Sequence, residues 1–560
     1  MIARPSQAPS ARRAARAPAR APARARRPLA AVLAGLLLLP ILAALPAGPL
    51  AAAGSSEPLP ALPAPNPDPA QALEAPQPEE AADGRPRFVK SACWFRVPRD
   101  RDMRCGFLEV PENRTKPTGR WIRLAVTIFE PDRERHPPVV YLTGGPGQPT
   151  YIETASDVDG WWWFVDREPW LRGRRLIVVD QRGVGLSQPA LDCPGLYDPV
   201  GWSGVVPTPD IQPDLAQDQA TMIEACRDRL LGEGIELAAY NTRESAADVA
   251  DLRRALEIDE WVLFGISYGT RLALTVLRDH PEGVVAAILD SVLPLEVDFI
   301  GESAASFEGA MEQLYEDCRN DPGCRDTFGD LRPLVTETVR RFDAAPLPLR
   351  LTGPGEAPQF LHVDGATYMW LLFGALYDWD AIERLPLLIY RTAHQDYRFL
   401  AERTRGAYLD AGDSDFAEGM QFSVGCNEEF PFYGETPAPE VSALYRGWVE
   451  GDFYLWACPL WPSGRADPAE NRPVASEIPV LLLSGAYDPI TPPAWAKNTL
   501  AHLPKGQFLE FEGIGHDVVD STDCGGEAVA DFLANPWRRP ITACVADMQP
   551  PYFVLDEVDW

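Results

Sequence analysis

The sequence is poor in the groups that metal-binding and nucleic-acid-binding proteins use. Its 560 residues include only six histidines, no Cys-x-x-Cys motif, and no two histidines at the spacing of zinc ligands. We therefore expect no metal, and no motif implies an organic cofactor. Acidic residues outnumber basic ones by 81 to 51, which gives a formal net charge of −30. Nucleic-acid-binding proteins usually have the opposite sign, so no nucleic-acid partner is expected.

The N-terminal end lacks acidic residues altogether. Residues 1–53 contain eight arginines and no carboxylate, and an apolar run that begins at Pro28 ends in three alanines, the last of them Ala53. A basic stretch, an apolar stretch and a small-residue site in this order are typical of a secretory signal peptide, so we expect cleavage near Ala53. A permanent membrane anchor is the alternative, although three prolines interrupt the run. No other apolar stretch has membrane-spanning length, so we expect no stable span once the signal is removed.

Residues 54–86 lack aromatic side chains and are rich in proline, alanine and glutamate. Such a segment cannot bury a core, and we expect a disordered linker. All ten cysteines follow it. An even number of cysteines in an exported chain indicates disulfides, although sequence alone does not fix their connectivity. Free buried thiols are the alternative. We expect sequence neighbours to pair, namely Cys93 with Cys105, Cys193 with Cys226, Cys318 with Cys324, Cys426 with Cys458, and Cys524 with Cys544. The predicted location is exported: secreted, periplasmic or associated with the cell envelope.

Short apolar runs and helical stretches alternate between residues 87 and 295. The runs Pro138–Leu142 and Arg175–Val179 end in glycine-containing turns, which is typical of buried parallel strands. Residues 296–477 show helical periodicity and many aromatics but no clear strands, and the strand pattern returns in residues 478–560. The sequence therefore predicts one α/β core with a mostly parallel sheet, formed by the first and last of these segments. The middle segment is expected to be a helical cap inserted late in the sheet.

One of the predicted helices precedes the most informative motif. It is expected at Ser245–Leu256, where Ser245 and Asp248 have the spacing of a capping box. Earlier in the chain, a Trp-Trp-Trp-Phe run at residues 161–164 has two interpretations. It either lines an apolar substrate pocket or packs against the cap.

A Gly-x-Ser-x-Gly motif, Gly265 to Gly269, lies between a predicted strand and a predicted helix. A sharp strand-to-helix turn of this kind leaves no room for side chains at the glycines and lifts the hydroxyl of Ser267 above the sheet edge. We predict that Ser267 is a nucleophile. The alternative is an inert serine in a glycine-rich turn.

A serine nucleophile needs a base, and the base needs an acid that orients it. In this fold the chain order is serine, acid, histidine, which leaves His502 and His516. His502 lies in a predicted helix, whereas His516 follows a predicted strand, where a loop can direct it at Ser267. We therefore predict His516 as the base. Asp488 ends a buried strand and is the predicted acid, and Asp290 is the second candidate. Asp517 and Asp520 are expected on the surface.

The oxyanion that forms during acyl transfer needs two backbone N–H donors. One is predicted to be the amide of Tyr268, which follows the nucleophile. The other is expected from Gly144-Gly-Pro-Gly147, which follows the third predicted strand, and we favour the amide of Gly145.

Four segments together resemble the prolyl iminopeptidase and tripeptidyl aminopeptidase group of α/β-hydrolases. They are Gly144–Gly147, Val179–Ser187 with its Asp-Gln-Arg-Gly sequence, Asn241–Asp248 and Gly265–Thr270. The C-terminal run from Pro479 through His516 to Cys544 is similar to the tripeptidyl aminopeptidase-like C-terminal domain. Prolyl iminopeptidases often have histidine where this chain has Thr143, and this chain is longer and carries an export signal. Both differences favour the secreted tripeptidyl aminopeptidase-like branch.

The resemblance implies an α/β-hydrolase fold and a serine peptidase that removes amino acids or short peptides from free peptide N-termini. A peptide with a free N-terminus is then the expected partner, and cap carboxylates must hold its ammonium group. The segment around Glu428 and Glu429 resembles the acidic cap segment of the group, so one of these two is the expected anchor. A solvated acidic turn is the alternative. A carboxylesterase with the same catalytic residues is the competing function, and the intact Ser, His and Asp set argues against a non-catalytic binding module.

Overall fold

The computed structural model describes residues 84–556 except 117–118, 195, 197–212, 352–358, 413–415 and 541–542. All described residues belong to one compact unit, Gly48–Trp560. The expected signal peptide, residues 1–53, and most of the expected linker, residues 54–86, lie outside the described residues.

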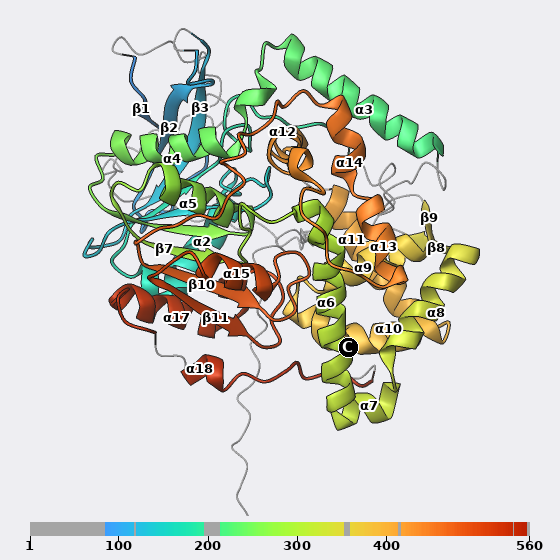
Figure 1. The fold of residues 1–560 in the computed structure, drawn as a ribbon. Helices are drawn as coiled ribbons and strands as arrows, with labels where there is room; N and C mark the ends of the chain where they lie inside the picture. Colours follow the sequence, from blue (N-terminus) through green and yellow to red (C-terminus); the bar gives the residue numbers. More distant parts are fainter. Residues whose placement is uncertain are drawn as a thin grey trace, which may run out of the picture. The chain divides into compact units, whose positions relative to one another are not determined.

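A nine-stranded sheet is at the centre of the described part, in the order β1-β2-β3-β5-β4-β6-β7-β10-β11 (Figure 1). The last six strands in this order run parallel, and β1, β2 and β3 are antiparallel. The mostly parallel α/β sheet expected from the sequence is confirmed. The strand bounds are β1 Arg87–Ser91, β2 Met103–Pro111, β3 Trp121–Phe129, β4 Val139–Leu142, β5 Leu176–Val179, β6 Trp261–Ile266, β7 Val284–Asp290, β10 Val480–Gly485 and β11 Gly506–Phe511.

The inner parallel strands are mostly apolar because helices cover both faces of such a sheet, whereas the edge strand β11 includes Gln507 and Glu510. Every residue of β5 and β10 is buried. Helix α5 (Tyr268–Asp279) is buried from Tyr268 to Leu277 and packs against β6, β7 and the neighbouring helix α4 (Thr242–Ala255). The remaining helices outside the insertion are α2 Ala155–Arg167, α3 Pro213–Gly232, α15 Pro493–Leu500, α16 Val518–Ser521, α17 Asp523–Ala534 and α18 Ala543–Ala546.

Helix α4 begins earlier than the sequence predicts. Its N-cap is Asn241, whose side chain accepts a hydrogen bond from the N–H of Glu244, so the expected capping box at Ser245 and Asp248 is wrong. Asn241 has the extended backbone conformation that a cap requires, and it starts the helix one turn sooner. Asp248 instead forms a buried ion pair with Arg182.

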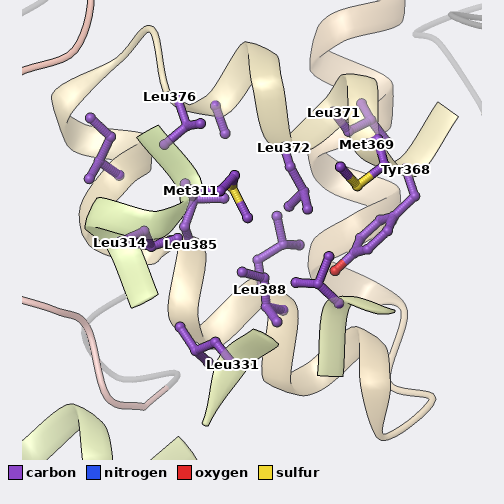
Figure 2. Close-up of a cluster of buried hydrophobic side chains, with 14 of the residues drawn as sticks. Met311, Leu314, Leu331, Tyr368, Met369, Leu371, Leu372, Leu376, Leu385 and Leu388 are labelled. Atoms are coloured by element: carbon purple, nitrogen blue, oxygen red, sulfur yellow. The ribbon is translucent and has the colours of Figure 1, made fainter. Parts of the chain in front are cut away.

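The chain between β7 and β10 is mainly helical and builds its own core. Figure 2 shows part of this core, where Met311, Leu314, Leu372, Leu385 and Leu388 pack together. In Figure 1 these helices gather beside the sheet. Their bounds are α6 Phe299–Asn320, α7 Pro322–Phe328, α8 Leu331–Ala344, α9 Gly365–Ala375, α10 Trp379–Ala393, α11 Arg398–Gly412, α12 Glu418–Glu428, α13 Ala443–Glu450 and α14 Phe453–Ala457. We propose that residues 296–477 form a cap domain on the core.

The insertion also contains an antiparallel hairpin that the sequence did not indicate. Its strands are β8 (Leu347–Leu351) and β9 (Gln359–Val363). Each has only five residues, which is too short for the alternating pattern of a strand to stand out among helices. The expectation of no strands in this segment was therefore wrong.

Five disulfides join the cysteines in the expected sequential pairs, from Cys93–Cys105 to Cys524–Cys544. This confirms the predicted pairing. After the last disulfide the chain returns to the insertion, where Phe553 and Val554 join its core and the N–H of Val554 donates to the carbonyl of Glu383. In the described part of the chain, no helix combines the length and the apolar character needed to cross a membrane.

Candidate active site

Ser267 occupies a sharp turn between β6 and α5. Its backbone has φ 55° and ψ −125°, a positive φ that is rare for a residue with a side chain. Conformations of this kind cost about 1–3 kcal/mol and persist only where the surroundings impose them. Here the surroundings are tight, because a Cβ atom on Gly265 would collide with the carbonyl of Gly269, and one on Gly269 with the carbonyl of Leu142. This is the strand-to-helix turn that the motif predicts.

The other predicted catalytic residues follow neighbouring strands at the same edge of the sheet. Strands β6, β7, β10 and β11 are adjacent and parallel, so their carboxyl ends lie side by side. Ser267 follows β6, Asp488 follows β10 and His516 follows β11. Asp290 ends β7, and its carbonyl accepts a hydrogen bond from the N–H of Ser267 at 3.0 Å.

His516 and Asp488 are in direct contact. Nδ1 of His516 lies 2.9 Å from Oδ2 of Asp488, which is 1% exposed. The carboxylate is held by its own loop: Oδ1 accepts from the N–H groups of Ile490 and Thr491 at 3.0 and 2.8 Å, and Oδ2 accepts from the Thr491 hydroxyl at 2.7 Å. The insertion supports the imidazole, whose ring stacks on Tyr377 at 4.9 Å. An Nδ1–H that donates to Asp488 leaves Nε2 free to accept a proton.

The charge around His516 favours its protonated form. Burial lowers the pKa of the imidazole, but the charge and hydrogen bond of Asp488 and the charge of Asp290 outweigh that effect. The net result is a pKa raised above the ordinary 6.5. An imidazolium formed during acyl transfer is stabilised by the same groups.

Asp290, the second candidate acid, holds the backbone that follows the histidine. Its two carboxylate oxygens accept from the N–H groups of Val518 and Val519 at 2.9 and 2.8 Å. Burial raises its pKa to about 6. Asp517 and Asp520 are partly buried rather than surface residues, because Asp517 caps the short helix α16 and its Oδ1 accepts from the N–H of Asp520.

The two predicted oxyanion donors belong to the turn that carries Ser267 and to the loop after β4. Tyr268 is the first residue of α5, and Gly145 lies in the loop after β4 with φ +104°. Neither backbone N–H has a hydrogen-bond acceptor among the described residues. The loop touches the turn itself, since a Cβ atom on Gly144 would lie 3.1 Å from Cβ of Ser267.

Glu428 and Glu429 are buried, so the alternative of a solvated acidic turn is wrong. Glu428 is 4% and Glu429 8% exposed. The Glu428 carboxylate accepts from the N–H and the hydroxyl of Thr242 at 2.6 and 2.5 Å, and it lies 3.4 Å from Nε of Arg271. Nη1 of Arg271 pairs with Glu429 at 2.5 Å. Arg271 comes from α5, and the hydroxyl of Thr242, which Glu428 binds, lies 2.8 Å from the hydroxyl of Tyr268, the first residue of that helix.

Glu429 has more acidic neighbours than basic ones. Burial raises the pKa of Glu429, the charge of Arg271 lowers it, and the charges of Glu428, Asp298 and Asp452 raise it, with a net value of about 7. The pKa of Asp452 is likewise raised to about 7, mainly by burial. Asp298 and Asp452 were missed in the sequence, although each is an N-cap before a helix and could have been found as such. A cavity along α5, lined in part by Arg271, borders Glu428.

The tryptophan run at residues 161–164 packs on the sheet. Trp161 stacks edge-on against Tyr141 of β4 at 4.9 Å, and Trp162 against Phe129 of β3 at 5.0 Å. Trp163 is 42% exposed. The ring contacts of Trp161 and Trp162 with the strands differ from the expected packing against the cap.

The sheet topology and the strand-to-helix turn at Ser267 are those of a serine hydrolase of the α/β-hydrolase fold. The family model described as "alpha/beta hydrolase fold" matches residues 137–521, and the chain belongs to this family. The fold and the family resemblance expected from the sequence are thereby confirmed.

Similar curated proteins have different activities in their names. "Serine protease Hip1" of Mycobacterium tuberculosis is 26% identical over 474 residues, covering 78% of this chain and 86% of that protein. "Tripeptidyl aminopeptidase" of Streptomyces lividans is 25% identical over 489 residues, covering 82% of each. "Carboxylesterase B" of Mycobacterium tuberculosis is 27% identical over 477 residues, covering 79% of this chain and 86% of that protein.

Proposed function

We propose that the protein is an exported serine aminopeptidase that releases amino acids or short peptides, of the tripeptidyl or prolyl type, from peptides with a free N-terminus. The observation that carries the proposal is a group of four neighbouring carboxylates, the buried Glu428, Glu429 and Asp298 and the partly buried Asp452, in which Arg271 is the cation paired with both glutamates. Uncompensated buried carboxylates are costly, and a substrate ammonium group would supply the missing positive charge. The relatives named serine protease and tripeptidyl aminopeptidase support the same activity.

In the proposed reaction, the Ser267 oxygen attacks the carbonyl carbon of the scissile bond while Nε2 of His516 takes the hydroxyl proton. Asp488 keeps the imidazole in the required tautomer and stabilises its charged form. The amides of Gly145 and Tyr268 donate to the oxyanion. His516 returns the proton to the leaving amine, which departs as the C–N bond breaks. Water, activated by His516, then hydrolyses the acyl-enzyme and frees Ser267.

Glu429 is better suited than Glu428 to bind the ammonium group. The oxygens of Glu428 are engaged by Thr242 and Arg271, which ties the end of α12 to the start of α4. Glu429 has the ion pair with Arg271 and a larger share of acidic neighbours. We therefore assign Glu429 to ammonium binding and Glu428 to holding Arg271 and α4 in place.

Export is part of the proposal. Five disulfides within the described residues fit an oxidising compartment, where such bonds persist. The expected signal peptide, residues 1–53, is outside the described residues and remains a prediction.

A carboxylesterase is the second candidate, because it would use the same catalytic residues and one relative has that name. Chromogenic amides of an amino acid, a dipeptide and a tripeptide, compared with a short-chain ester, distinguish the two. We expect turnover of at least one amide and its loss in Ser267→Ala. Turnover of the ester alone would favour the carboxylesterase, and an active Ser267→Ala variant would refute the nucleophile.

An isosteric substitution of Glu429, compared with the same substitution at a control glutamate, tests the ammonium site. Glu429→Gln is expected to raise KM for free-amine substrates about 10- to 100-fold, because a charge-assisted contact is lost. Glu418→Gln is the matched control, because Glu418 is another buried glutamate, at the opposite end of α12, with a pKa that burial raises to about 7. It accepts from the N–H of Cys193. An equal loss of Glu429→Gln activity on N-acetylated substrates would show structural damage and contradict the assignment.

A further inference from the structure

Two side chains of the Asp-Gln-Arg-Gly segment have no role in the mechanism above, yet they contact the loop that carries Gly145. This loop, residues 143–150, is called the oxyanion loop here. It follows β4, and Asp180 and Gln181 follow β5. The two strands are parallel neighbours, with Tyr141 opposite Val178, so the segments after them lie side by side at the sheet edge.

The two side chains hold the oxyanion loop at its two ends. Nε2 of Gln181 donates to the carbonyl of Thr143 at 3.1 Å. Oδ1 of Asp180 accepts from the N–H and the hydroxyl of Thr150, at 2.8 and 2.6 Å. Asp180 is 1% and Gln181 5% exposed, so water competes little for these bonds.

Asp180 is itself fixed to the sheet. Its N–H donates to the carbonyl of Ala125 in β3 at 3.0 Å, and its carbonyl accepts from the hydroxyl of Ser187 at 2.7 Å. Oδ2 accepts from the N–H of Leu186 at 2.9 Å. The far end of the loop has a second support, because Nε1 of Trp161 donates to the carbonyl of Thr150 at 2.8 Å. The loop is thus hydrogen-bonded to residues that strand β3 and helix α2 hold in place.

We propose that Asp180 and Gln181 are positioning residues that set the location of the Gly145 amide relative to Ser267. This inference rests on the proposed function, in which that amide stabilises the oxyanion. Between the two clamped ends lie six residues, 144–149, and the glycine at their start packs against Cβ of Ser267. An oxyanion donor acts only when it lies within hydrogen-bond reach of the developing charge, and a misplacement of about 1 Å can cost about 100-fold in rate.

Gln181→Met removes the bond to the Thr143 carbonyl, and Thr150→Val removes the hydroxyl bond to Asp180 while the N–H of residue 150 still donates. Both substitutions nearly conserve volume. Two substitutions elsewhere are matched controls. Gln507→Met removes an Nε2 donor to the carbonyl of Pro536, at 2.9 Å, and Thr404→Val removes a buried hydroxyl that donates to the carbonyl of Leu400, at 2.7 Å. Thr150→Ser keeps the hydroxyl and serves as the conservative variant. It is expected to retain most of the wild-type kcat.

The measurements are kcat and KM on the best amide, the melting temperature, and the inhibition constant of a peptidyl trifluoromethyl ketone. The Ser267 oxygen adds to the ketone carbon, the hydroxyl proton goes to His516, and the product carries an oxyanion that needs the same two amides. We expect kcat to fall about 10- to 100-fold in Gln181→Met and Thr150→Val, with KM changed less than about threefold. The inhibition constant of the ketone should rise in proportion, while that of a peptide product stays the same.

An unchanged kcat in both variants, or equal losses in the two controls, would overturn the proposal. The proposal would also be overturned if kcat fell in step with the melting temperature while the ratio of the inhibition constants of the ketone and the peptide product stayed constant. That ratio also decides the matter if a variant is only partly folded, because it does not depend on the active fraction. Failure of the proposed function has a different signature, namely wild-type turnover of the short-chain ester alone, or turnover that survives Ser267→Ala.

Discussion

Replacing Asp488 by asparagine should disable His516 through its tautomer. Two backbone N–H groups, of Ile490 and Thr491, donate to Oδ1, so an asparagine must keep its carbonyl oxygen there. Its NH₂ group then takes the place of Oδ2 and faces Nδ1 of His516, which is 2.9 Å from that oxygen in the native protein. Because two donors cannot bond, the imidazole is driven to the tautomer with hydrogen on Nε2, which cannot accept the proton of Ser267.

The expected loss in kcat/KM at neutral pH is about 10³- to 10⁴-fold, or about 4–5.5 kcal/mol of transition-state stabilisation. The pH profile should change as well. Protonated His516 cannot act as a base, so activity falls as pH drops through its pKa, which is raised above 6.5 in the native protein. Removing the charge of Asp488 lowers that pKa, and the acid limb of the residual activity should move to lower pH.

The assay is kcat/KM against pH for wild type, Asp488→Asn and Asp290→Asn, with melting temperatures to verify folding. Asp290→Asn is the matched comparison, because this carboxylate accepts backbone N–H groups after the histidine and makes no bond to the ring. It should reduce activity far less than Asp488→Asn. The account of the acid is wrong if Asp488→Asn keeps activity within tenfold of wild type, or if Asp290→Asn is the inactive variant.

Three further predictions concern stability, read from urea unfolding. Arg271→Met leaves buried carboxylates without their cation and should lower the free energy of unfolding by about 3–5 kcal/mol. The loss should be smaller at low pH, where the carboxylates are protonated, and an unchanged urea midpoint would contradict the ion-pair geometry. Replacing Cys426 and Cys458, 32 positions apart, with serine should cost about 3–4 kcal/mol, whereas a loss under about 1 kcal/mol would show that the bond adds little. Asn241→Ala should lower the free energy of unfolding by about 1 kcal/mol, and Ser245→Ala by less than about 0.5 kcal/mol. The reverse order would show that Ser245, as expected from the sequence, is the N-cap.

The sequence predicted the parts of the molecule that depend on local pattern. Apolar runs such as the one before Asp488 became parallel strands, and the glycines beside Ser267 marked a turn with no room for a Cβ atom. The contact of His516 with Asp488 was inferred from their places after two late strands. The structure brings the two side chains together, because parallel neighbouring strands end at the same edge.

What could not be predicted depends on contacts between distant segments. The burial of Glu429 follows from Arg271, which lies more than 150 positions earlier and carries no local signal of that pairing. The contacts that hold the oxyanion loop join residues 30 and 38 positions apart through two adjacent strands. The cap of α4 was misplaced because Asn241 and Ser245 are both acceptable caps in sequence, and only the backbone conformation distinguishes them.

The central claim is that a serine hydrolase of this fold recognises a free amino terminus. The most direct measurement is the ratio of kcat/KM for one peptide amide with a free N-terminus to that for its N-acetylated form, in wild type and in Glu429→Gln. We predict a ratio of at least about 100 in wild type, and a ratio reduced at least tenfold in the variant, since acetylation removes the charge that the buried carboxylates would compensate. A wild-type ratio near one would contradict the claim, even if substitutions confirm Ser267, His516 and Asp488 as the catalytic residues.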